Sequence, residues 1–160
     1  MSSSAALGRP FKYIANNIDM KIFVIAMSLG LAVPAVWAAD YGGYKGVGGM
    51  TAYNIPDNVY EYHYDKGFTG VDAMGWDPNL QYAWSRIGAA KTCGIAFDER
   101  KVLAALDTRY PQGEVIHKMI GIDFAYLHSK HNPKFCTEER VLELKEMLPL
   151  FEAGQFPSKF

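Results

Sequence analysis

The chain has 160 residues, of which 21% are charged and 14% are aromatic, and its formal net charge is −1. This balance argues against a nucleic-acid-binding protein, because Lys and Arg form no basic stripe. The composition as a whole is not that of a membrane protein, and the length permits one small domain in addition to a membrane segment.

Residues 22–39 are the only long run without a charge, with the sequence IFVIAMSLGLAVPAVWAA. In an α-helix this run would extend for about 27 Å, which is close to the thickness of the hydrocarbon core of a bilayer. We therefore predict a transmembrane helix over residues 22–39. A signal peptide cleaved near Val36-Trp37-Ala38 is the alternative, but the run and the stretch before it are both long for a signal.

The charges on the two sides of this run differ in sign. Residues 1–21 contain three basic residues and one acidic residue, whereas residues 40–160 contain 13 Lys and Arg against 16 Asp and Glu. The more basic flank of a membrane helix stays on the cytoplasmic or matrix side. We therefore expect residues 1–21 on that side and residues 40–160 across the membrane.

Residues 40–84 are rich in glycine and tyrosine. Five of the ten positions 41–50 are Gly, and seven of the ten tyrosines lie between Tyr41 and Tyr82. Because neither a helical nor a strand period is sustained there, we predict an extended segment whose rings lie in grooves of a larger partner. An irregular, β-rich region of the chain's own fold is the alternative, and the sequence favours neither.

Residues 85–160 show helical patterns in three pieces. The first covers residues 97–106 and begins with two acids, which suit the positive end of a helix. The second covers residues 114–128 and carries a broad apolar stripe. The third begins after Thr137, a predicted N-cap, and ends near Gly154.

Together these patterns predict a mainly α fold with long irregular segments. It comprises one transmembrane helix, a Gly/Tyr-rich extended segment and about three short helices, the last of which Pro149 is expected to kink or shorten. The predicted regions are an N-terminal segment, the transmembrane helix, the extended segment and a helical region, over residues 1–21, 22–39, 40–84 and 85–160.

No arrangement of residues in the sequence indicates catalysis. His128, His131 and Cys136 lie near one another, but a structural zinc site needs four ligands and there is no second close pair. The glycines of residues 42–49 lack the strand, helix and Lys-Ser/Thr pair of a phosphate-binding loop. We therefore predict a non-catalytic chain without a metal site, a cofactor site or a catalytic residue.

The two cysteines are the one candidate structural site. Cys93 precedes the first predicted helix of residues 85–160 and Cys136 precedes the third, so a bond between them would close a loop of 42 intervening residues. In an oxidising compartment such a disulfide would stabilise the fold by about 4 kcal/mol. Two buried free thiols are the alternative.

Two short segments, SLGLA at residues 28–32 and AGQFPS at residues 153–158, carry a resemblance to a known family. The first is similar to the S-L-G-V-A stretch in the single membrane helix of cytochrome c oxidase subunit VIc. The second resembles the terminal A-G-x-F-x-S of the same family, whereas residues 40–84 have no counterpart there. The resemblance implies a mitochondrial inner-membrane protein with its N-terminus in the matrix, a helical region in the intermembrane space, and no haem or copper ligand.

The function implied by this resemblance is that of an accessory subunit of the respiratory electron-transport chain. It would stabilise a membrane protein complex, cytochrome c oxidase first of all, through contacts with other subunits and with the lipid bilayer. An accessory subunit of respiratory complex I or III is a close alternative. From a different class, the alternative is an exported soluble protein that binds a small ligand through its aromatic-rich half after signal cleavage.

Overall fold

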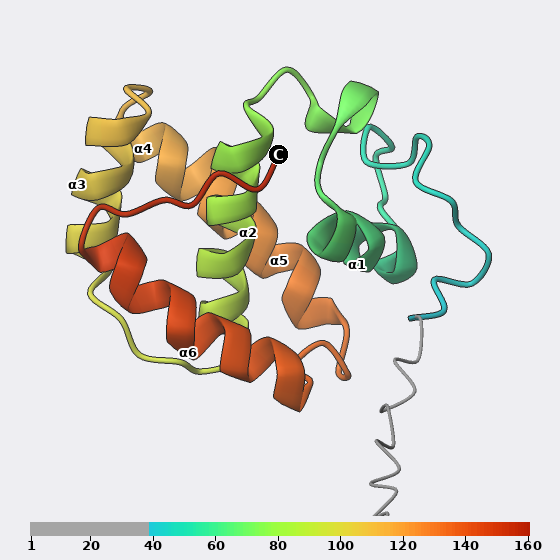
Figure 1. Ribbon diagram of the computed structural model, residues 1–160. Coiled ribbons are helices and arrows are strands. Elements are labelled where there is room, and N and C mark those ends of the chain that lie inside the picture. The colour runs from blue at the N-terminus through green and yellow to red at the C-terminus, as the bar shows by residue number, and fades with distance from the viewer. Residues whose placement is uncertain (1–38) are drawn as a thin grey trace, which may run out of the picture. The chain divides into compact units, whose positions relative to one another are not determined.

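The computed structural model describes residues 39–160, and within this range the chain forms helices and loops without strands (Figure 1). Helix α4, the π-helical segment η2 and helix α5 follow one another without a break, so that they act as one long helix, and η1 is a short 3-10 turn. The bounds are α1 Asp57–Lys66, η1 Gly70–Ala73, α2 Pro78–Thr92, α3 Glu99–Arg109, α4 Glu114–Ile116, η2 His117–Ile122, α5 Asp123–His131 and α6 Glu138–Glu152.

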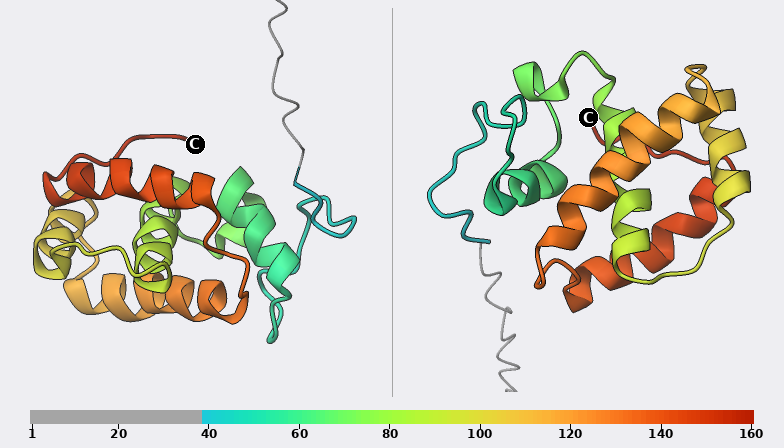
Figure 2. Two further views of the ribbon diagram at one scale, coloured as in Figure 1. Left: turned by 90° about the horizontal axis from the view of Figure 1, so that it is seen from below. Right: turned by 180° about the vertical axis from the view of Figure 1, so that it is seen from behind.

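Helix α2 lies at the centre of this domain. Asp77 caps its start, because the carboxylate accepts hydrogen bonds from the backbone N–H groups of Asn79 and Leu80 at 2.8 and 3.0 Å. Pro78 occupies the first turn, where a missing N–H does no harm. Figure 2 shows α2 between α6 and α5, and α2 packs on both. Every residue from 80 to 90 is buried as a result.

A glycine allows α2 and α5 to cross at close range. A Cβ atom on Gly88 would lie 2.6 Å from the Cβ of Ala125 and 2.6 Å from the backbone nitrogen of Tyr126. Real side chains do not approach so closely, so only glycine permits this crossing. The crossing brings the backbone of the long helix against α2.

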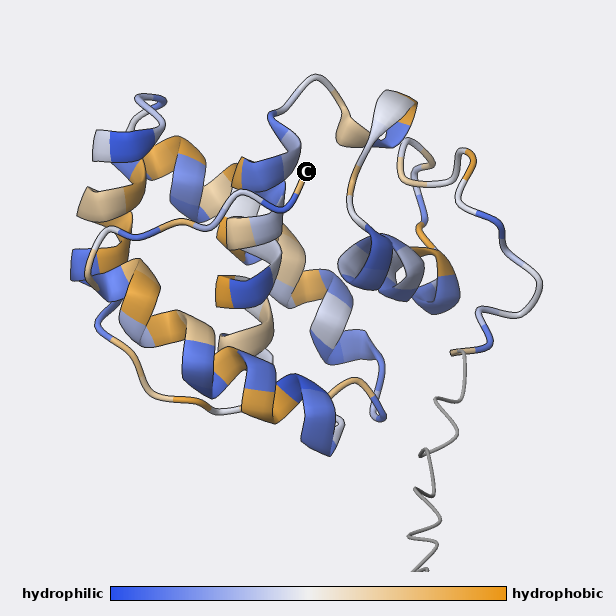
Figure 3. Cartoon of the chain, viewed as in Figure 1, coloured by the Kyte–Doolittle hydropathy of each residue, from blue (hydrophilic) through white to orange (hydrophobic). Residues whose placement is uncertain are grey.

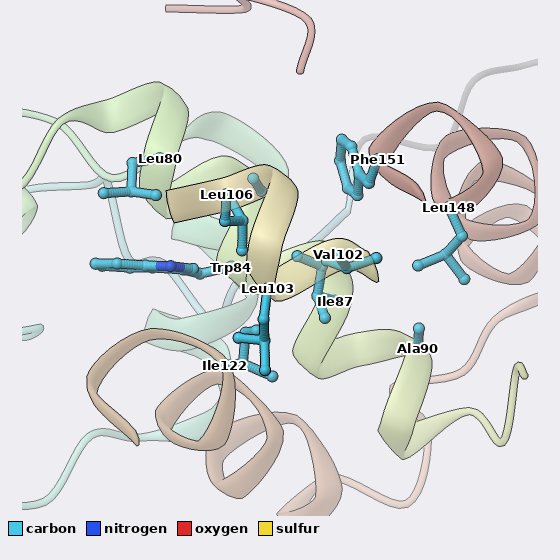
Figure 4. Close-up of a cluster of buried hydrophobic side chains, with 11 residues drawn as sticks. Leu80, Trp84, Ile87, Ala90, Val102, Leu103, Leu106, Ile122, Leu148 and Phe151 are labelled. Carbon is cyan, nitrogen blue, oxygen red and sulfur yellow. The ribbon is translucent and has the colours of Figure 1, made fainter. Parts of the chain in front are cut away.

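The core consists of two clusters of buried side chains. In the first, drawn in Figure 4, side chains of α2 meet Val102 and Leu106 of α3, Ile122 of η2 and Phe151 of α6. The second joins α1 to α5 and α6, and four of its ten buried members are aromatic. These members are Met50, Ile55, Val59, Tyr60, Tyr64, Phe68, Ala89, Ala125, Phe135 and Leu144. The two clusters hold the helices together on both sides of α2.

The three helices predicted in residues 85–160 are confirmed, with changes at their ends. Residues 97–106 correspond to α3, and residues 114–128 correspond to the long helix that continues to His131. Thr137 caps α6 by accepting a hydrogen bond from the backbone N–H of Arg140 at 3.2 Å. Helix α6 continues past Pro149 to Glu152, so the proline does not end it early, and Gly154 follows with a φ of 74°.

The prediction of an extended segment over residues 40–84 is wrong for nearly half of its length. Residues 39–56 do lack helix and strand, but α1 and the first half of α2 lie within the segment, and the β-rich alternative is also wrong because residues 39–160 contain no strand. The rings of Tyr60, Tyr64 and Tyr82 are buried in this domain and not held out for a partner. The helical period of α1 is hidden because three of the four residues on its buried face are Tyr or His, and the helix is coloured mostly hydrophilic in Figure 3.

The predicted transmembrane helix, with the signal-peptide alternative, lies outside the described residues except for its last position, as does the predicted N-terminal segment. Within residues 39–160, no helix combines the length and the apolar content that crossing a membrane requires.

Candidate functional site: an apolar cavity beside the π-helical segment

An apolar cavity of about 160 Å³ is lined by residues of α1, α2, the long helix and the segments on either side of η1. Five of the eleven lining residues are aromatic, and the other six are Met74, Gln81, Ser85, Ile120, Gly121 and Ala125. The rings come from four parts of the chain and belong to Tyr60, Phe68, Trp76, Trp84 and Phe124. The cavity therefore exists only in the folded domain.

The indole of Trp84 is held in place by a buried histidine. The indole nitrogen donates a hydrogen bond to Nδ1 of His117 at 3.1 Å, and Nε2 of His117 donates to the carbonyl oxygen of Tyr110 at 2.9 Å. Both ring nitrogens of His117 thus have partners, with the proton on Nε2 and a lone pair on Nδ1. Trp76 packs edge-on against Trp84, with ring centroids 5.2 Å apart. This arrangement fixes one wall of the cavity.

The π-helical segment η2 packs against the indole ring of Trp84. The backbone N–H of Asp123 bonds to the carbonyl oxygen of Lys118, five residues earlier, which is the spacing of a π-helix. A Cβ atom on Gly121 would lie 2.1 Å from the Trp84 ring, so glycine is required for the helix backbone to rest on the indole. Short π-helical turns of this kind occur often at functional sites.

The polar side chains that line the cavity donate their hydrogen bonds to backbone carbonyl oxygens of the domain. Gln81 donates through its amide nitrogen to the carbonyl oxygen of Ala73, and the Ser85 hydroxyl donates to that of Tyr82 at 2.8 Å. The Tyr60 hydroxyl donates to the carbonyl oxygen of Ala125 at 3.2 Å, and burial raises the pKa of Tyr60 far above its usual value, so the hydroxyl stays neutral. None of the described residues that line the cavity is charged. The cavity therefore suits an uncharged, apolar group.

Met74 and Ile120 line the cavity and are also exposed, by 36% and 48% of their surface, so the cavity opens to solvent beside them. We call this opening the mouth. Val71 and Met119, which lie near these two residues in sequence, are exposed by 69% and 61%.

Met74 is the one residue other than glycine with a positive φ in the described part of the chain, at 52°. A side chain disfavours this left-handed conformation, and such residues concentrate at functional sites.

A second polar centre, formed by His63 and Asp72, lies behind the cavity wall. Asp72 accepts hydrogen bonds from the backbone N–H groups of Gly48 and Met50 at 3.0 and 3.1 Å. His63 lies 2.8 Å from the Tyr44 hydroxyl through Nε2 and donates through Nδ1 to the carbonyl oxygen of Gly67 at 3.0 Å. His63 and Asp72 are each only 1% exposed, which leaves no room for a substrate. We interpret this centre as the anchor of residues 39–56 on α1 and η1.

Two arginines join α1 and α2 to α6. Arg86 lies between the rings of Tyr64 and Tyr82, at 3.9 and 4.1 Å from their centroids, and donates to Glu143 at 3.0 and 3.1 Å. Arg140, the second of these residues, forms ion pairs of 3.0 Å with two acids of α1, Glu61 and Asp65. We interpret these contacts as structural, because they join helices to one another and neither arginine lines the cavity.

The structure joins Cys93 and Cys136 by a disulfide, with their Cα atoms 5.5 Å apart. Cys93 is the C-cap of α2, and Cys136 directly precedes the N-cap of α6. His128 packs on the rings of Tyr60 and Phe124, and the three residues considered for a metal cluster cannot all serve because Cys136 is bonded. Among residues 39–160 there is no group of three or more His, Cys, Asp or Glu side chains placed to hold a metal ion.

Sequence reasoning did not find the cavity. Four of its five aromatic residues lie in the predicted extended segment, whereas Ile120, Phe124 and Ala125 lie in the predicted amphipathic helix of residues 114–128. The signals that bear on it are Gly121 inside a helical pattern and the Met74-Gly75 pair, both of which mark unusual backbone.

The segment that carries the family resemblance, residues 153–158, packs within this domain. The ring of Phe156 stacks on Phe151 with centroids 5.2 Å apart and meets Tyr110 at 6.3 Å. Beyond it, Asn79 at the start of α2 accepts hydrogen bonds from the backbone N–H groups of Lys159 and Phe160 at 2.7 and 2.9 Å. Residues 153–160 are therefore held against α2, α6 and the C-cap of α3.

No known family matches the sequence, and comparisons with curated proteins and with solved structures also give no match.

Proposed function

We propose that this chain is a non-catalytic accessory subunit of a respiratory complex in the mitochondrial inner membrane, with cytochrome c oxidase as the first candidate. In this proposal residues 22–39 anchor the chain, and the helical domain binds neighbouring subunits in the intermembrane space. The observation that carries the proposal is the apolar surface beside the cavity, where Ile120 and Met119 of the long helix are exposed by 48% and 61%. Exposed apolar residues that adjoin an apolar cavity are typical of surfaces that bind a partner.

Two further observations support the proposal. The Cys93–Cys136 disulfide suits a compartment that is oxidising, such as the intermembrane space. The buried polar groups described above serve packing between helices, so their arrangement gives no reason to assign catalysis to them. Resemblance at residues 28–32 and 153–158 is what favours cytochrome c oxidase over complexes I and III.

The experiment is native gel separation of mitochondrial membranes, followed by identification of the proteins that migrate with the tagged chain. We expect subunits of cytochrome c oxidase in the same band. Migration with complex I or III alone would replace the first candidate by one of the alternatives, and migration with none of the three would refute the proposal.

A matched pair of variants tests the apolar surface itself. We expect Met119→Glu to reduce the fraction of the chain in the complex by about tenfold or more, because a carboxylate would be buried without a partner. Leu142→Glu on α6 is the control, since Leu142 is exposed to a similar extent, 55% against 61% for Met119. Equal loss in both variants, or loss in neither, would show that this surface is not the one that binds.

The cavity itself favours a second candidate, an exported soluble protein that binds a small apolar ligand. This candidate requires that a signal peptide be removed. Intact-mass measurement of the native protein separates the two, because cleavage near Ala38 would remove the whole apolar run, whereas an anchored subunit keeps it.

A further inference from the structure

We propose that the cavity beside η2 is a binding site for a single neutral aromatic ring. The ring is either a side chain of a neighbouring subunit or part of a free small molecule, and the chemistry of recognition is the same for both. The proposal concerns residues of the described domain alone. The first part of its test uses the proposed membrane anchor only to hold the chain in nanodiscs, and the second part rests on the proposed assembly with a complex.

The size of the cavity sets the size of the occupant. The volume is about 160 Å³. An apolar cavity of about 150 Å³ in another protein stays dry and binds benzene. The cavity therefore fits one six-membered ring, and a long acyl chain would leave most of its length outside.

The wall explains why the occupant should be aromatic and uncharged. Trp76, Trp84 and Phe124 offer ring faces and edges, which attract another ring in edge-to-face or offset contact. Met74 adds a thioether, and sulfur makes favourable contacts with aromatic rings. A charged occupant would find no counter-ion, because none of the described lining residues is charged.

The backbone at the mouth supports a role in binding over a packing defect. Met74 keeps a side chain at a φ of 52° and a ψ of 31°, where glycine would be easier to accommodate, and the next residue, Gly75, has a φ of 82°. This conformation places a flexible apolar side chain at the opening of the cavity. Ile120, the other exposed lining residue by which the mouth is defined, lies in the π-helical turn. Two unusual backbone features thus flank one opening.

The first part of the test uses the full-length chain in lipid nanodiscs with fluorobenzene as the probe, followed by fluorine NMR. We expect saturable binding beyond that to empty nanodiscs. A charged probe of similar size, 4-fluorobenzylammonium, should bind at least about tenfold more weakly, because its ammonium group would lose water without gaining a partner. Absence of saturable fluorobenzene binding, or equal binding of the charged probe, would overturn the proposal.

A matched pair of variants locates the probe. Ile120→Trp places a large ring at the mouth, whereas Leu127→Trp makes the same kind of change on the same long helix at a residue that does not line the cavity. Both original side chains are 48% exposed, so neither variant should unfold the domain. We expect fluorobenzene affinity to fall about tenfold or more in Ile120→Trp and to stay unchanged in Leu127→Trp. Equal affinities in the two variants would place the probe elsewhere and overturn the proposal.

The second part repeats the fluorobenzene measurement on the assembled complex isolated from membranes. Loss of binding on assembly, in a chain that binds the probe when free, supports a ring supplied by a neighbouring subunit. Retained binding supports a free small molecule as the natural occupant. If the chain assembles with no complex, the proposed function fails while the result of the first part still decides the proposal made here.

Discussion

Removal of the Cys93–Cys136 disulfide is the perturbation whose effect on stability follows most directly from the structure. The bond joins residues 43 apart in the sequence, and the loop that it closes contains α3 and the whole long helix. In the chain-entropy description, removal of a cross-link over a loop of this length lowers the free energy of unfolding by about 4 kcal/mol. The variant Cys93→Ala/Cys136→Ala should therefore be less stable than the wild type by this amount.

The assay is unfolding in guanidinium chloride, followed by the near-ultraviolet circular dichroism of the packed tryptophans. We expect the midpoint to fall and the slope m to rise, because an unfolded chain without the cross-link exposes more surface. Treatment of the wild type with a reductant should reproduce both changes, and the same reductant should leave the double variant unaffected. That comparison separates the effect of the bond from the effect of the two alanine side chains.

A loss of less than about 1 kcal/mol would refute this reasoning, since it would mean that the loop gains little freedom on unfolding. Residual contacts among α3, η2 and α5 in the denatured chain would then restrict the loop without the bond. An unchanged m together with a full loss of stability would point instead to strain or lost packing in the native state. Each result therefore identifies which state of the chain the disulfide acts on.

Two further predictions concern α6 and α5. Glu143→Leu should lower the free energy of unfolding by about 2–4 kcal/mol, because Arg86 is only 2% exposed and would keep a buried charge without its carboxylate. The double variant Arg86→Leu/Glu143→Leu should recover at least half of this loss. Urea unfolding of the wild type, both single variants and the double variant measures the difference. Burial, with a smaller contribution from nearby His131, lowers the pKa of His128 below its usual 6.5, so the folded state favours the neutral ring. The stability that this provides is present above pH 6.5 and is lost as the pH falls through the lower pKa of the folded state. The stability measured between about pH 7 and pH 5 should decline less steeply in His128→Gln, and an identical slope would contradict this reading.

Two of the three helices that the sequence predicted correctly, α3 and α6, share a capped start and one apolar face. Thr137 and Asp98 both accept a hydrogen bond from the backbone of the first turn, at 3.2 Å in each case. Their helices are amphipathic because each has one side in the core and the other in water. These are local properties, and local sequence is enough to reveal them.

Helices α1 and α2 were missed for opposite physical reasons. The inner face of α1 includes residues with polar atoms, among them Tyr60 and His63, whose side chains bond to Ala125 and Tyr44 in other parts of the chain. Helix α2 is buried on all sides, so it has no polar face to give it a period. Its cap, Asp77 with Pro78, is a strong start signal that the glycines and tyrosines around it obscured.

The cavity was beyond prediction from the sequence because its wall is assembled from segments far apart in the chain. Tyr60 and Ala125, whose hydrogen bond is part of that wall, are 65 residues apart. No periodicity or motif reports such a distance. The disulfide, in contrast, joins the only two cysteines of the chain, so the sequence could name it as one of two alternatives, although Cys93 lies at the end of α2 and not directly before α3.

Two departures from regular local structure, at Met74 and in η2, involve residues that line the cavity. The helix starts at Asp77, Asp98 and Thr137 follow the usual rules of capping. The left-handed Met74 and the π-helical turn at Ile120, by contrast, both adjoin the mouth of the cavity. A sequence that served stability alone would place glycine at residue 74 and a regular turn in the long helix. Because both exceptions lie beside the same opening, we infer that the cavity is a feature that the domain maintains and not a fault in its packing.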